Sequence, residues 1–374
     1  MKARNLDQFK AALTRQLMPR WNLLYSDAAN IYWVHNGNVA RRAEEVDWSK
    51  PVPGWTKQTE WGPYIPFERY PQLVNPPSGF LQNCNNPHWV ATRNSGLKPL
   101  EPAPYYLQAT PKADAGEEVL NTRGERLSRI LGEDRKFTLE EMFDLGFDAY
   151  ILPADVIVPL LMNAAAKREP LNDPRLAQAL ASLRGWDRRS SKASVAYTYL
   201  YYWAKTYKDL FSASKFSRFI SYERGRIDIQ SAGEQDMAWR ALEEAIARLE
   251  KRFGKSQVTW GEINVVVRGG VFPVDGTNTF GVLHPDEGPE QDDGRIFCND
   301  GWAHLMVVLE GEPKQIWSLL PYGESEHSSS PHYNDQTKLH SDRKLKRFWF
   351  TPSEILEHTE SVWGDKGRIK LLFK

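Results

Sequence analysis

The sequence predicts an α+β fold, and the order of its hydrophobic patterns is the reason. Patterns typical of β-strands occupy the first 120 residues, helical patterns run from about Asn121 to Gly254, and strand patterns return after residue 260. Strands and helices that are segregated along a chain in this way are typical of α+β domains. We therefore expect a sheet built from both ends of the sequence, with the helical block inserted as a lobe.

The N-terminal region predicts one helix and three strands. A set of apolar residues recurs at helical spacing before Pro19, which closes the helix; the set is Leu6, Phe9, Leu13 and Leu17. Strand patterns follow at residues 21–25, 31–35 and 79–82, separated by turns rich in Pro, Gly, Asn and Asp. Four prolines between residues 97 and 116 then predict an irregular connection to the helical block.

The helical block carries start and stop signals. Thr138 is followed three residues later by Glu141, which is the pattern of a capping box. A stripe of apolar residues at helical spacing ends at Gly254, a typical C-cap residue; the stripe comprises Leu242, Ile246, Leu249 and Phe253. Strand patterns then return at residues 262–268, 303–309, 315–320 and 369–373.

The composition argues against two classes of partner. The 374 residues include 48 acidic and 48 basic side chains, so the formal net charge is zero and no basic surface for nucleic acid is expected. The longest apolar run, at residues 156–166, contains Pro159 and Asn163 and is shorter than the ~20 residues of a membrane span. The first ten residues lack the apolar segment of a secretory signal, so the residues themselves assign no compartment.

The two cysteines and one acidic stretch raise the question of a disulfide and of a metal. Cys84 and Cys298 can form a disulfide, but two buried thiols are the commoner outcome for a core of this size. The acidic stretch at residues 286–294 is expected to be a solvated loop. Calcium is possible there, but the ligand spacing of an EF-hand loop is missing, so we assign no calcium ligand and expect no cofactor.

The stretch from Val74 to Asn86 is the most informative part of the sequence. A turn-forming Asn-Pro-Pro-Ser-Gly leads into an apolar segment that ends in three asparagines, Asn83, Asn85 and Asn86. Carboxamides clustered at a strand end suit the stabilisation of an oxyanion, because they donate hydrogen bonds without carrying a charge. Such clusters are also common in plain turns, so the surrounding motifs must decide between the two interpretations.

Three ordered blocks of motifs decide between these two interpretations. The first block combines Trp-Asn-Leu-Leu-Tyr-Ser-Asp, Pro-Val-Pro-Gly-Trp-Thr and Glu-Trp-Gly-Pro-Tyr-Ile-Pro-Phe with the asparagine motif, at residues 21–27, 51–56, 60–67 and 75–86. The second is Leu-Arg-Gly-Trp-Asp-Arg at residues 183–188. The third joins Pro-Tyr-Gly-Glu-Ser to Ser-Pro-His-Tyr-Asn-Asp-Gln, at residues 321–325 and 330–336. Together these blocks closely resemble the β-subunit of the penicillin acylase family, in particular its acyl-homoserine lactone acylase and aculeacin acylase branch. The blocks are spread over nearly the whole chain, which makes the resemblance specific.

The resemblance implies an N-terminal nucleophile hydrolase with a four-layer αββα sandwich and an inserted helical lobe. In this family a precursor cleaves itself, and the new N-terminal serine attacks an amide while its own α-amine acts as the base. The implied reaction is hydrolysis of an N-acyl bond in a fatty acyl amide such as an acyl-homoserine lactone or a lipopeptide. A periplasmic or secreted location is implied as well. Residues 1–120 would hold core-sheet strands and the oxyanion motif, residues 121–254 the helical lobe, and residues 255–374 the return strands.

The resemblance also assigns two site residues. Asn85 matches the family's oxyanion-hole asparagine. Arg123 matches the arginine that contacts this asparagine and the amine of the nucleophile, a task that suits a rigid fork of donors. Arg126 is the alternative match for this arginine. Asn83 and Asn86 are expected to satisfy backbone groups of the turn.

The histidines carry no recognisable metal motif. No His-Glu-x-x-His pattern or paired cysteine spacing accompanies His327 and His332. His35 and His88 are expected to face solvent. By resemblance, a further group is structural and ties the late segment to the core; it comprises His332, Tyr333, Asp335 and Gln336.

The sequence lacks the nucleophile that the resemblance requires. It begins Met-Lys-Ala-Arg, which resembles sequence well inside the family's β-chain, and no Gly-Ser dipeptide occurs. Cys298, in Phe-Cys-Asn-Asp-Gly-Trp, mimics the start of a mature β-chain but is expected to be structural. We therefore expect the C-terminal portion of a β-subunit, partnered by the α-chain and the first part of the β-chain and inactive alone. The competing hypothesis is a catalytically inactive binding or structural protein that retains the fold.

Overall fold

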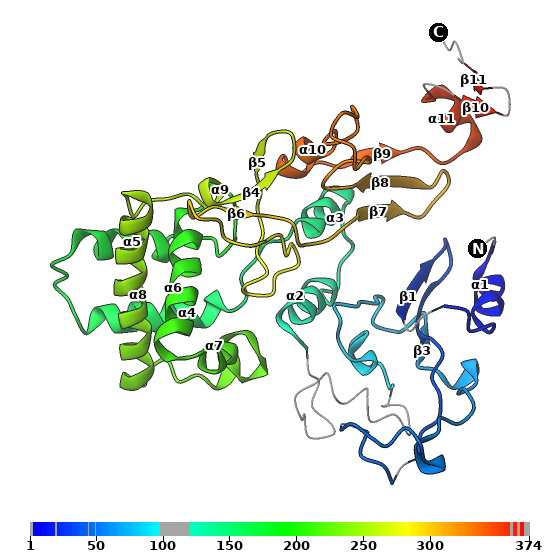
Figure 1. Ribbon diagram of the computed structural model, residues 1–374, viewed down its shortest axis with the longest axis horizontal. Helices are drawn as coiled ribbons and strands as arrows, with labels where there is room; N and C mark the ends of the chain where they lie inside the picture. Colours follow the sequence, from blue (N-terminus) through cyan, green and yellow to red (C-terminus); the bar gives the residue numbers. More distant parts are fainter. Residues whose placement is uncertain are drawn as a thin grey trace.

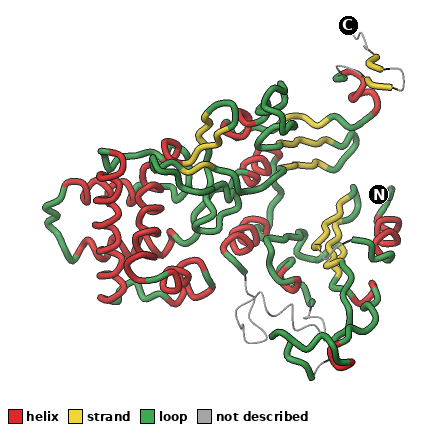
Figure 2. Tube along the Cα trace, viewed as in Figure 1, coloured by secondary structure: helices red, strands yellow, loops and turns green. Residues whose placement is uncertain are grey.

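Among the residues that it describes, the computed structural model combines a helical region with four small sheets (Figure 1). It describes residues 3–18, 21–43, 45–48, 50–97, 120–359, 362–364 and 367–369. Figure 2 shows most helices gathered at one end of the molecule and most strands towards the other. The predicted combination of helix and sheet is therefore confirmed. Within the described residues, no helix is both long enough and apolar enough to span a membrane.

The N-terminal region forms a three-stranded antiparallel sheet covered by one helix. The elements are α1 (Leu6–Leu13), β1 (Trp21–Ser26), β2 (Ile31–Asn36) and β3 (Gln72–Val74), with sheet order β1-β2-β3. Short 3₁₀ turns follow at η1 (Lys57–Thr59), η2 (Phe67–Arg69) and η3 (His88–Val90). The central strand β2 is buried because α1 packs on it through Leu6 and Leu13. The helix is shorter than predicted, and Leu17 is 72% exposed.

The helical region begins at residue 122. Its helices are α2 (Thr122–Leu131), α3 (Leu139–Gly146), α4 (Ala154–Ala166), α5 (Pro174–Arg184), α6 (Val195–Phe211), α7 (Ala213–Ile220) and α8 (Ala232–Phe253), with a 3₁₀ turn η5 (Tyr222–Arg226). Both predicted helix signals are confirmed: Thr138 and Glu141 form the capping box of α3, and α8 ends at Gly254 with a left-handed φ of 70°.

Aromatic side chains fill the core of the helical region. Trp203 on α6 is fully buried, and its indole N–H donates to the carbonyl of Ala238 on α8 at 2.9 Å. Tyr197 and Trp260 are buried with it, and their rings meet edge to face at 4.7 Å. Each ring of this size removes roughly 150–250 Å² from water when it is buried. Most of the aromatic residues in this region therefore act as core rather than as a ligand pocket.

The C-terminal region contains three of the four sheets. Its elements are α9 (Trp260–Ile263), β4 (Asn264–Val267), β5 (Val271–Pro273), β6 (Ile296–Phe297), β7 (Leu305–Leu309), β8 (Gln315–Leu319), α10 (Thr337–Ser341), β9 (Lys346–Phe348), α11 (Pro352–Glu357), β10 (Val362–Gly364) and β11 (Gly367–Ile369). Strand β4 pairs antiparallel with β5 and parallel with β6. Strands β7, β8 and β9 form an antiparallel meander, and β10 pairs with β11.

A single sheet built from both ends of the chain does not form within the described residues. The β1-β2-β3 sheet and the β7-β8-β9 sheet are separate, and a side-chain hydrogen bond of 2.8 Å from Ser26 to Glu310 runs between them. Both edge strands carry large apolar side chains that are at least 40% exposed: Trp21 and Leu24 on β1, and Met306, Val308 and Leu309 on β7. The sequence pattern predicted these strands, but it does not determine which other strands they pair with.

Two further expectations on secondary structure are corrected. Residues 79–82 form a loop rather than a strand, because the backbone N–H of Gln82 donates to Ala91 and its side chain donates to Val90 instead of to a neighbouring strand. Residues 262 and 263 belong to the short helix α9, and the strand starts at Asn264. The irregular connection expected up to residue 116 and the strand expected up to residue 373 lie largely outside the described residues.

The burial of several polar residues differs from expectation. Cys84 and Cys298 are buried free thiols, as the more common outcome predicted. His35 and His88 are buried rather than solvent-facing, with 9% and 3% exposed. The acidic stretch is only partly solvated, because Asp286 is 2% exposed. The acidic composition of residues 286–294 gives no sign that residues distant in the sequence bury Asp286.

Candidate active site

The asparagine motif forms a tight loop, and its local geometry explains the choice of residue. The side chain of Asn83 accepts a hydrogen bond from the backbone N–H of Asn85 at 3.2 Å, which closes an Asx turn. Asn85 has a left-handed φ of 60°, a conformation that asparagine tolerates better than other side chains that carry a Cβ. The turn presents the side chain of Asn85 at the surface, while Cys84 and Asn86 point into the protein.

The first turn of α2 lies against this loop. Asn121 caps the helix by accepting from the N–H of Gly124 at 2.9 Å, and its own amide donates to the carbonyl of Cys84 at 2.7 Å. A Cβ on Gly124 would lie 2.2 Å from the side-chain oxygen of Asn86, so the lack of a side chain at this position allows the close approach. The positive end of the α2 dipole is therefore held beside the asparagine loop.

Arg123 joins the helix to Asn85. Its Nη2 donates to Asn85 Oδ1 at 2.8 Å and to the carbonyl of Cys84 at 3.3 Å. Because the carboxamide oxygen is occupied by the guanidinium, the Nδ2 amide of Asn85 faces outward as the donor. This amide makes no hydrogen bond to any part of the chain that the structure describes. An oriented, uncharged donor beside a fixed positive charge is suited to stabilising a developing oxyanion.

The structure decides which of the two candidate arginines, Arg123 or Arg126, contacts Asn85. Arg126 does not contact Asn85; its Nε lies 2.6 Å from Asp148 Oδ2, and its guanidinium stacks over the ring of Tyr150. Asp148 is 3% exposed and also binds Arg189 at 2.6 Å. Arg123 is thus the arginine in contact with Asn85, whereas Arg126, one turn further along the same helix, anchors α2 to Asp148.

The remaining motif residues behave as structural groups. Asn83 satisfies the backbone of the turn, as expected. Asn86 is 7% exposed, and its Oδ1 finds no hydrogen-bond partner among the described residues. Burial raises the pKa of the Cys84 thiol to about 11, while the charge of Arg123 opposes the shift. Cys84 is therefore not a thiolate nucleophile at neutral pH.

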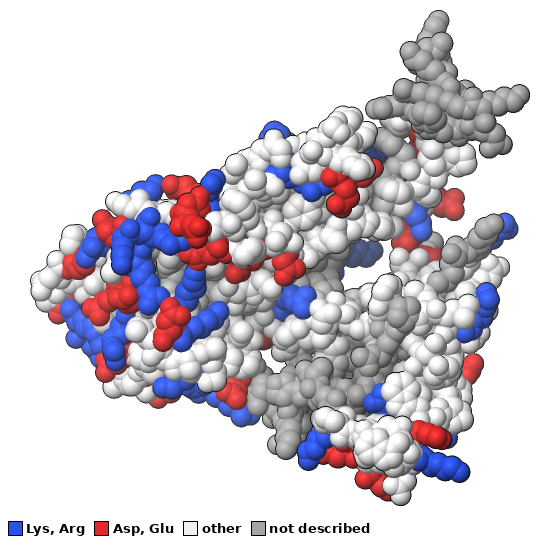
Figure 3. All heavy atoms as spheres, in the orientation of Figure 1, with Lys and Arg blue, Asp and Glu red and all other residues white. Residues whose placement is uncertain are grey.

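Two cavities lie near α2 and α3. One of about 450 Å³ has charged walls of both signs, including Arg126, Arg135, Asp148 and Arg189. The other, of about 380 Å³, is an apolar groove between α3 and β7, with Met142 among the residues that line it. Neither is lined by Asn85 or Arg123. On the face shown in Figure 3, acidic and basic side chains are intermingled over the helical region, without a large patch of one sign.

The motif at residues 330–336 connects the segments that follow strands β4 and β8. Gln336 accepts from the N–H of Leu320 at 2.9 Å, and Asn334 donates to the carbonyl of Arg268 at 2.8 Å. The guanidinium of Arg268 stacks over Tyr333 at 4.0 Å. These contacts agree with the structural role expected for this block.

Sequence reasoning missed two groups of polar residues. The first is Asp148 with its two arginines. The second is a buried cluster of His284, Asp286 and His340, whose ligand atoms all lie within 4.8 Å of one another. Its members come from segments more than fifty residues apart, so no local spacing could have revealed it.

Comparison with protein families shows which known proteins the chain resembles. The family model described as penicillin amidase matches residues 1–357. Penicillin G acylase of Escherichia coli is 24% identical over 96% of this chain and 46% of its own length. Acyl-homoserine lactone acylase PvdQ of Pseudomonas syringae pv. syringae is 23% identical over 88% of this chain and 42% of its own length. The chain therefore spans about half the length of these relatives.

Comparison of structures gives the same assignment for the fold. The thermostable penicillin G acylase from Alcaligenes faecalis superposes with a TM-score of 0.58 at 20% sequence identity, covering 100% of this chain and 71% of that chain. At this level of identity the match shows the fold alone.

Proposed function

Because the chain belongs to the penicillin amidase family, we propose that it forms part of an amide hydrolase that cleaves an N-acyl bond. The observation that carries the proposal is the Asn85–Arg123 pair, in which the arginine fixes the carboxamide oxygen and leaves the amide as a donor. Relatives named for penicillin G and for acyl-homoserine lactones support an acyl amide as the substrate. We propose a fatty acyl amide, such as an acyl-homoserine lactone or a lipopeptide.

The proposed mechanism assigns a role to each group of the site. An N-terminal serine attacks the substrate carbonyl with its own α-amine as base. The oxyanion that forms receives a hydrogen bond from Asn85 Nδ2, and Arg123 holds the asparagine in the productive orientation. In this proposal the serine, the α-chain and the first part of the β-chain come from outside these 374 residues.

The proposal also covers the architecture. We propose that residues 1–120 and 255–374 contribute strands to a four-layer αββα sandwich and that residues 121–254 form its helical lobe. The exposed apolar side chains of the edge strands β1 and β7 support this, because such surfaces are normally covered in a finished domain.

We expect acylase activity only when the chain is combined with the polypeptide that supplies the serine. The test compares the purified 374-residue chain with the product of the complete reading frame, using a long-chain acyl-homoserine lactone and penicillin G. Release of the free amine is followed by chromatography. A higher rate with the lactone would support the fatty acyl assignment, and a higher rate with penicillin G would move it to arylacetyl amides. Turnover by the chain alone would contradict the assignment of the nucleophile, and binding without turnover by both proteins would indicate a catalytically inactive binding protein.

Arg123→Lys should lower kcat of the processed enzyme by about 10- to 100-fold. The guanidinium Nη2 reaches both Asn85 Oδ1 and the carbonyl of Cys84, and the ammonium of lysine, on a shorter and more flexible side chain, would not be held in the same place. A hydrogen bond to a charged group contributes about 1.5–3 kcal/mol. Steady-state kinetics with Arg129→Lys as the control measures this effect, since Arg129 pairs with Glu125 on the exposed side of the same helix. Equal rates for the two variants would argue against a role for Arg123 in the site.

A further inference from the structure

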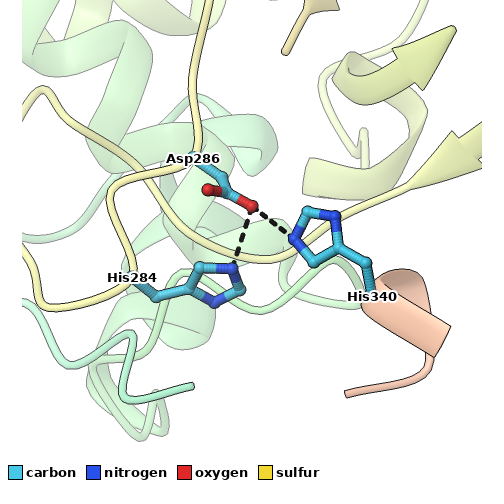
Figure 4. Close-up of side chains that lie close together, drawn as sticks. All are labelled: His284, Asp286 and His340. Atoms are coloured by element: carbon cyan, nitrogen blue, oxygen red, sulfur yellow. Dashed lines mark hydrogen bonds and ion pairs between the residues drawn. The ribbon is translucent and has the colours of Figure 1, made fainter. Parts of the chain in front are cut away.

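A second polar cluster lies in the core and shares no residue with the asparagine loop. His284, Asp286 and His340 are each no more than 2% exposed (Figure 4). Asp286 Oδ2 lies 3.0 Å from His284 Nε2 and 2.5 Å from His340 Nε2. A carboxylate and two imidazoles thus converge on one point where water is largely excluded.

The backbone holds the three side chains in this arrangement. The N–H of His284 donates to the carbonyl of Asp148, and its carbonyl accepts from Thr277, so the segment is fixed. Asp286 lies two residues further along, while His340 comes from α10, where its N–H donates to Gln336. A Cβ on Gly301 would lie 2.1 Å from Asp286 Oδ1. Gly301 therefore packs against Oδ1, and Oδ2 is the carboxylate oxygen that faces the two histidines.

Aromatic rings surround the cluster. Trp302 stacks on His284 with ring centroids 5.3 Å apart, and it meets His340 edge to face at 5.1 Å. Phe147 meets His284 edge to face at 5.7 Å and also contacts Trp302, with ring centroids 5.8 Å apart. These apolar walls lower the local dielectric constant, which strengthens the interaction of the carboxylate with any cation at the point of convergence.

The charges of the cluster require a positive group between its members. A carboxylate buried this deeply is costly unless it is paired, and among the described residues the two histidines make its ion pairs. His340 Nε2 reaches Asp286 Oδ2 at ion-pair distance but has no hydrogen-bond partner in the described structure. At this distance the lone pairs of His340 Nε2 and Asp286 Oδ2 repel each other unless a proton or a metal ion lies between the two atoms.

We propose that His284, Asp286 and His340 bind a divalent transition-metal ion, with zinc as the ion that fits best. Two imidazole nitrogens and one carboxylate oxygen form a common zinc donor set, whereas calcium prefers oxygen ligands. Donor atoms bound to a tetrahedral zinc lie roughly 3.3–3.6 Å apart. The three donors here already lie within 4.8 Å of one another, so small side-chain movements suffice. The ion would fasten α10 to the segment that contains His284 and Asp286.

The test measures zinc binding by the full 374-residue chain. Metal is removed with a chelator, one equivalent of Zn²⁺ is added, and the zinc retained after gel filtration is measured by mass spectrometry. Cobalt(II) absorption provides a second readout of the ligand set. We expect one zinc per chain and a Tm that rises by several degrees when zinc is bound, because the ion binds the folded state.

The variants localise the site. His340→Gln and Asp286→Asn should each lower zinc affinity at least tenfold, as expected when a ligand is lost, while His327→Gln should bind like the original chain because His327 is an exposed histidine. If His340→Gln fails to fold, zinc titrations of the unmodified chain and of Asp286→Asn still test whether the cluster binds the ion. No retained zinc and no change in Tm with the unmodified chain, or equal binding by all the variants, would overturn the proposal in favour of a proton-bridged cluster.

Discussion

Replacing Asn85 by alanine in the processed enzyme should lower kcat by ~10²–10³, about the loss that follows removal of one oxyanion donor. The amide of Asn85 is aimed outward by Arg123 and has no hydrogen bond to the described residues, so its main partner would be the charge that develops in the transition state. A donor of this kind stabilises the transition state more than bound substrate, so KM should change much less than kcat. Self-cleavage of the precursor should slow as well, because it passes through a similar intermediate.

Asn83→Ala is the matched control for this prediction. Asn83 lies in the same loop, but its side chain accepts from the backbone N–H of Asn85 and closes the turn. Its loss should cost about a neutral hydrogen bond, roughly 0.5–1.5 kcal/mol in stability, and lower kcat by less than the Asn85 variant. Steady-state kinetics on correctly processed protein compares the two. A greater loss of kcat with Asn83→Ala would move the oxyanion assignment to that residue.

Local signals in the sequence predicted the features whose causes are local. The capping box of Thr138 and Glu141 forms because both partners lie within one turn of helix, so no distant residue is needed. Gly254 ends α8 for the same kind of reason, since a left-handed residue after the last turn is easiest for glycine. The contact between Arg123 and Asn85 is different. It joins residues 38 positions apart and was expected from the resemblance to a family, not from the spacing itself.

Features that depend on tertiary contacts could not be predicted in the same way. Residues 79–82 carry an apolar pattern, but the hydrogen-bonding groups of Gln82 are satisfied by the turn at residues 88–91 rather than by a strand. The apolar patterns of β1 and β7 identify strands without identifying their neighbours. His340 follows a motif that the sequence assigned to structure, yet its side chain meets Asp286 only because α10 packs beside that segment.

Asp148→Asn should lower the free energy of unfolding by about 2–4 kcal/mol. Asp148 is 3% exposed and binds Arg126 and Arg189 at 2.6 Å each, so the substitution leaves two guanidinium groups without their carboxylate. Removing one partner of a buried ion pair typically costs 3–5 kcal/mol. We place the effect somewhat lower because the arginine side chains are 23% and 38% exposed and can be partly rehydrated. Denaturation by urea measures the change.

The matched control is Asp173→Asn, which removes the same charge from a surface pair. Asp173 pairs with Arg175 at 2.7 Å and caps α5, and asparagine is an equally good N-cap residue. Its effect should therefore stay below about 1 kcal/mol. The Asp148→Asn variant also tests the link to the Asn85–Arg123 pair, because Arg126 lies on α2 three residues after Arg123. If Asp148 anchors this helix, the Asp148→Asn substitution should reduce kcat as well as stability. Equal stability of the two variants would show that the buried pair contributes no more than a surface pair, and that α2 is held by its packing and by Asn121 instead.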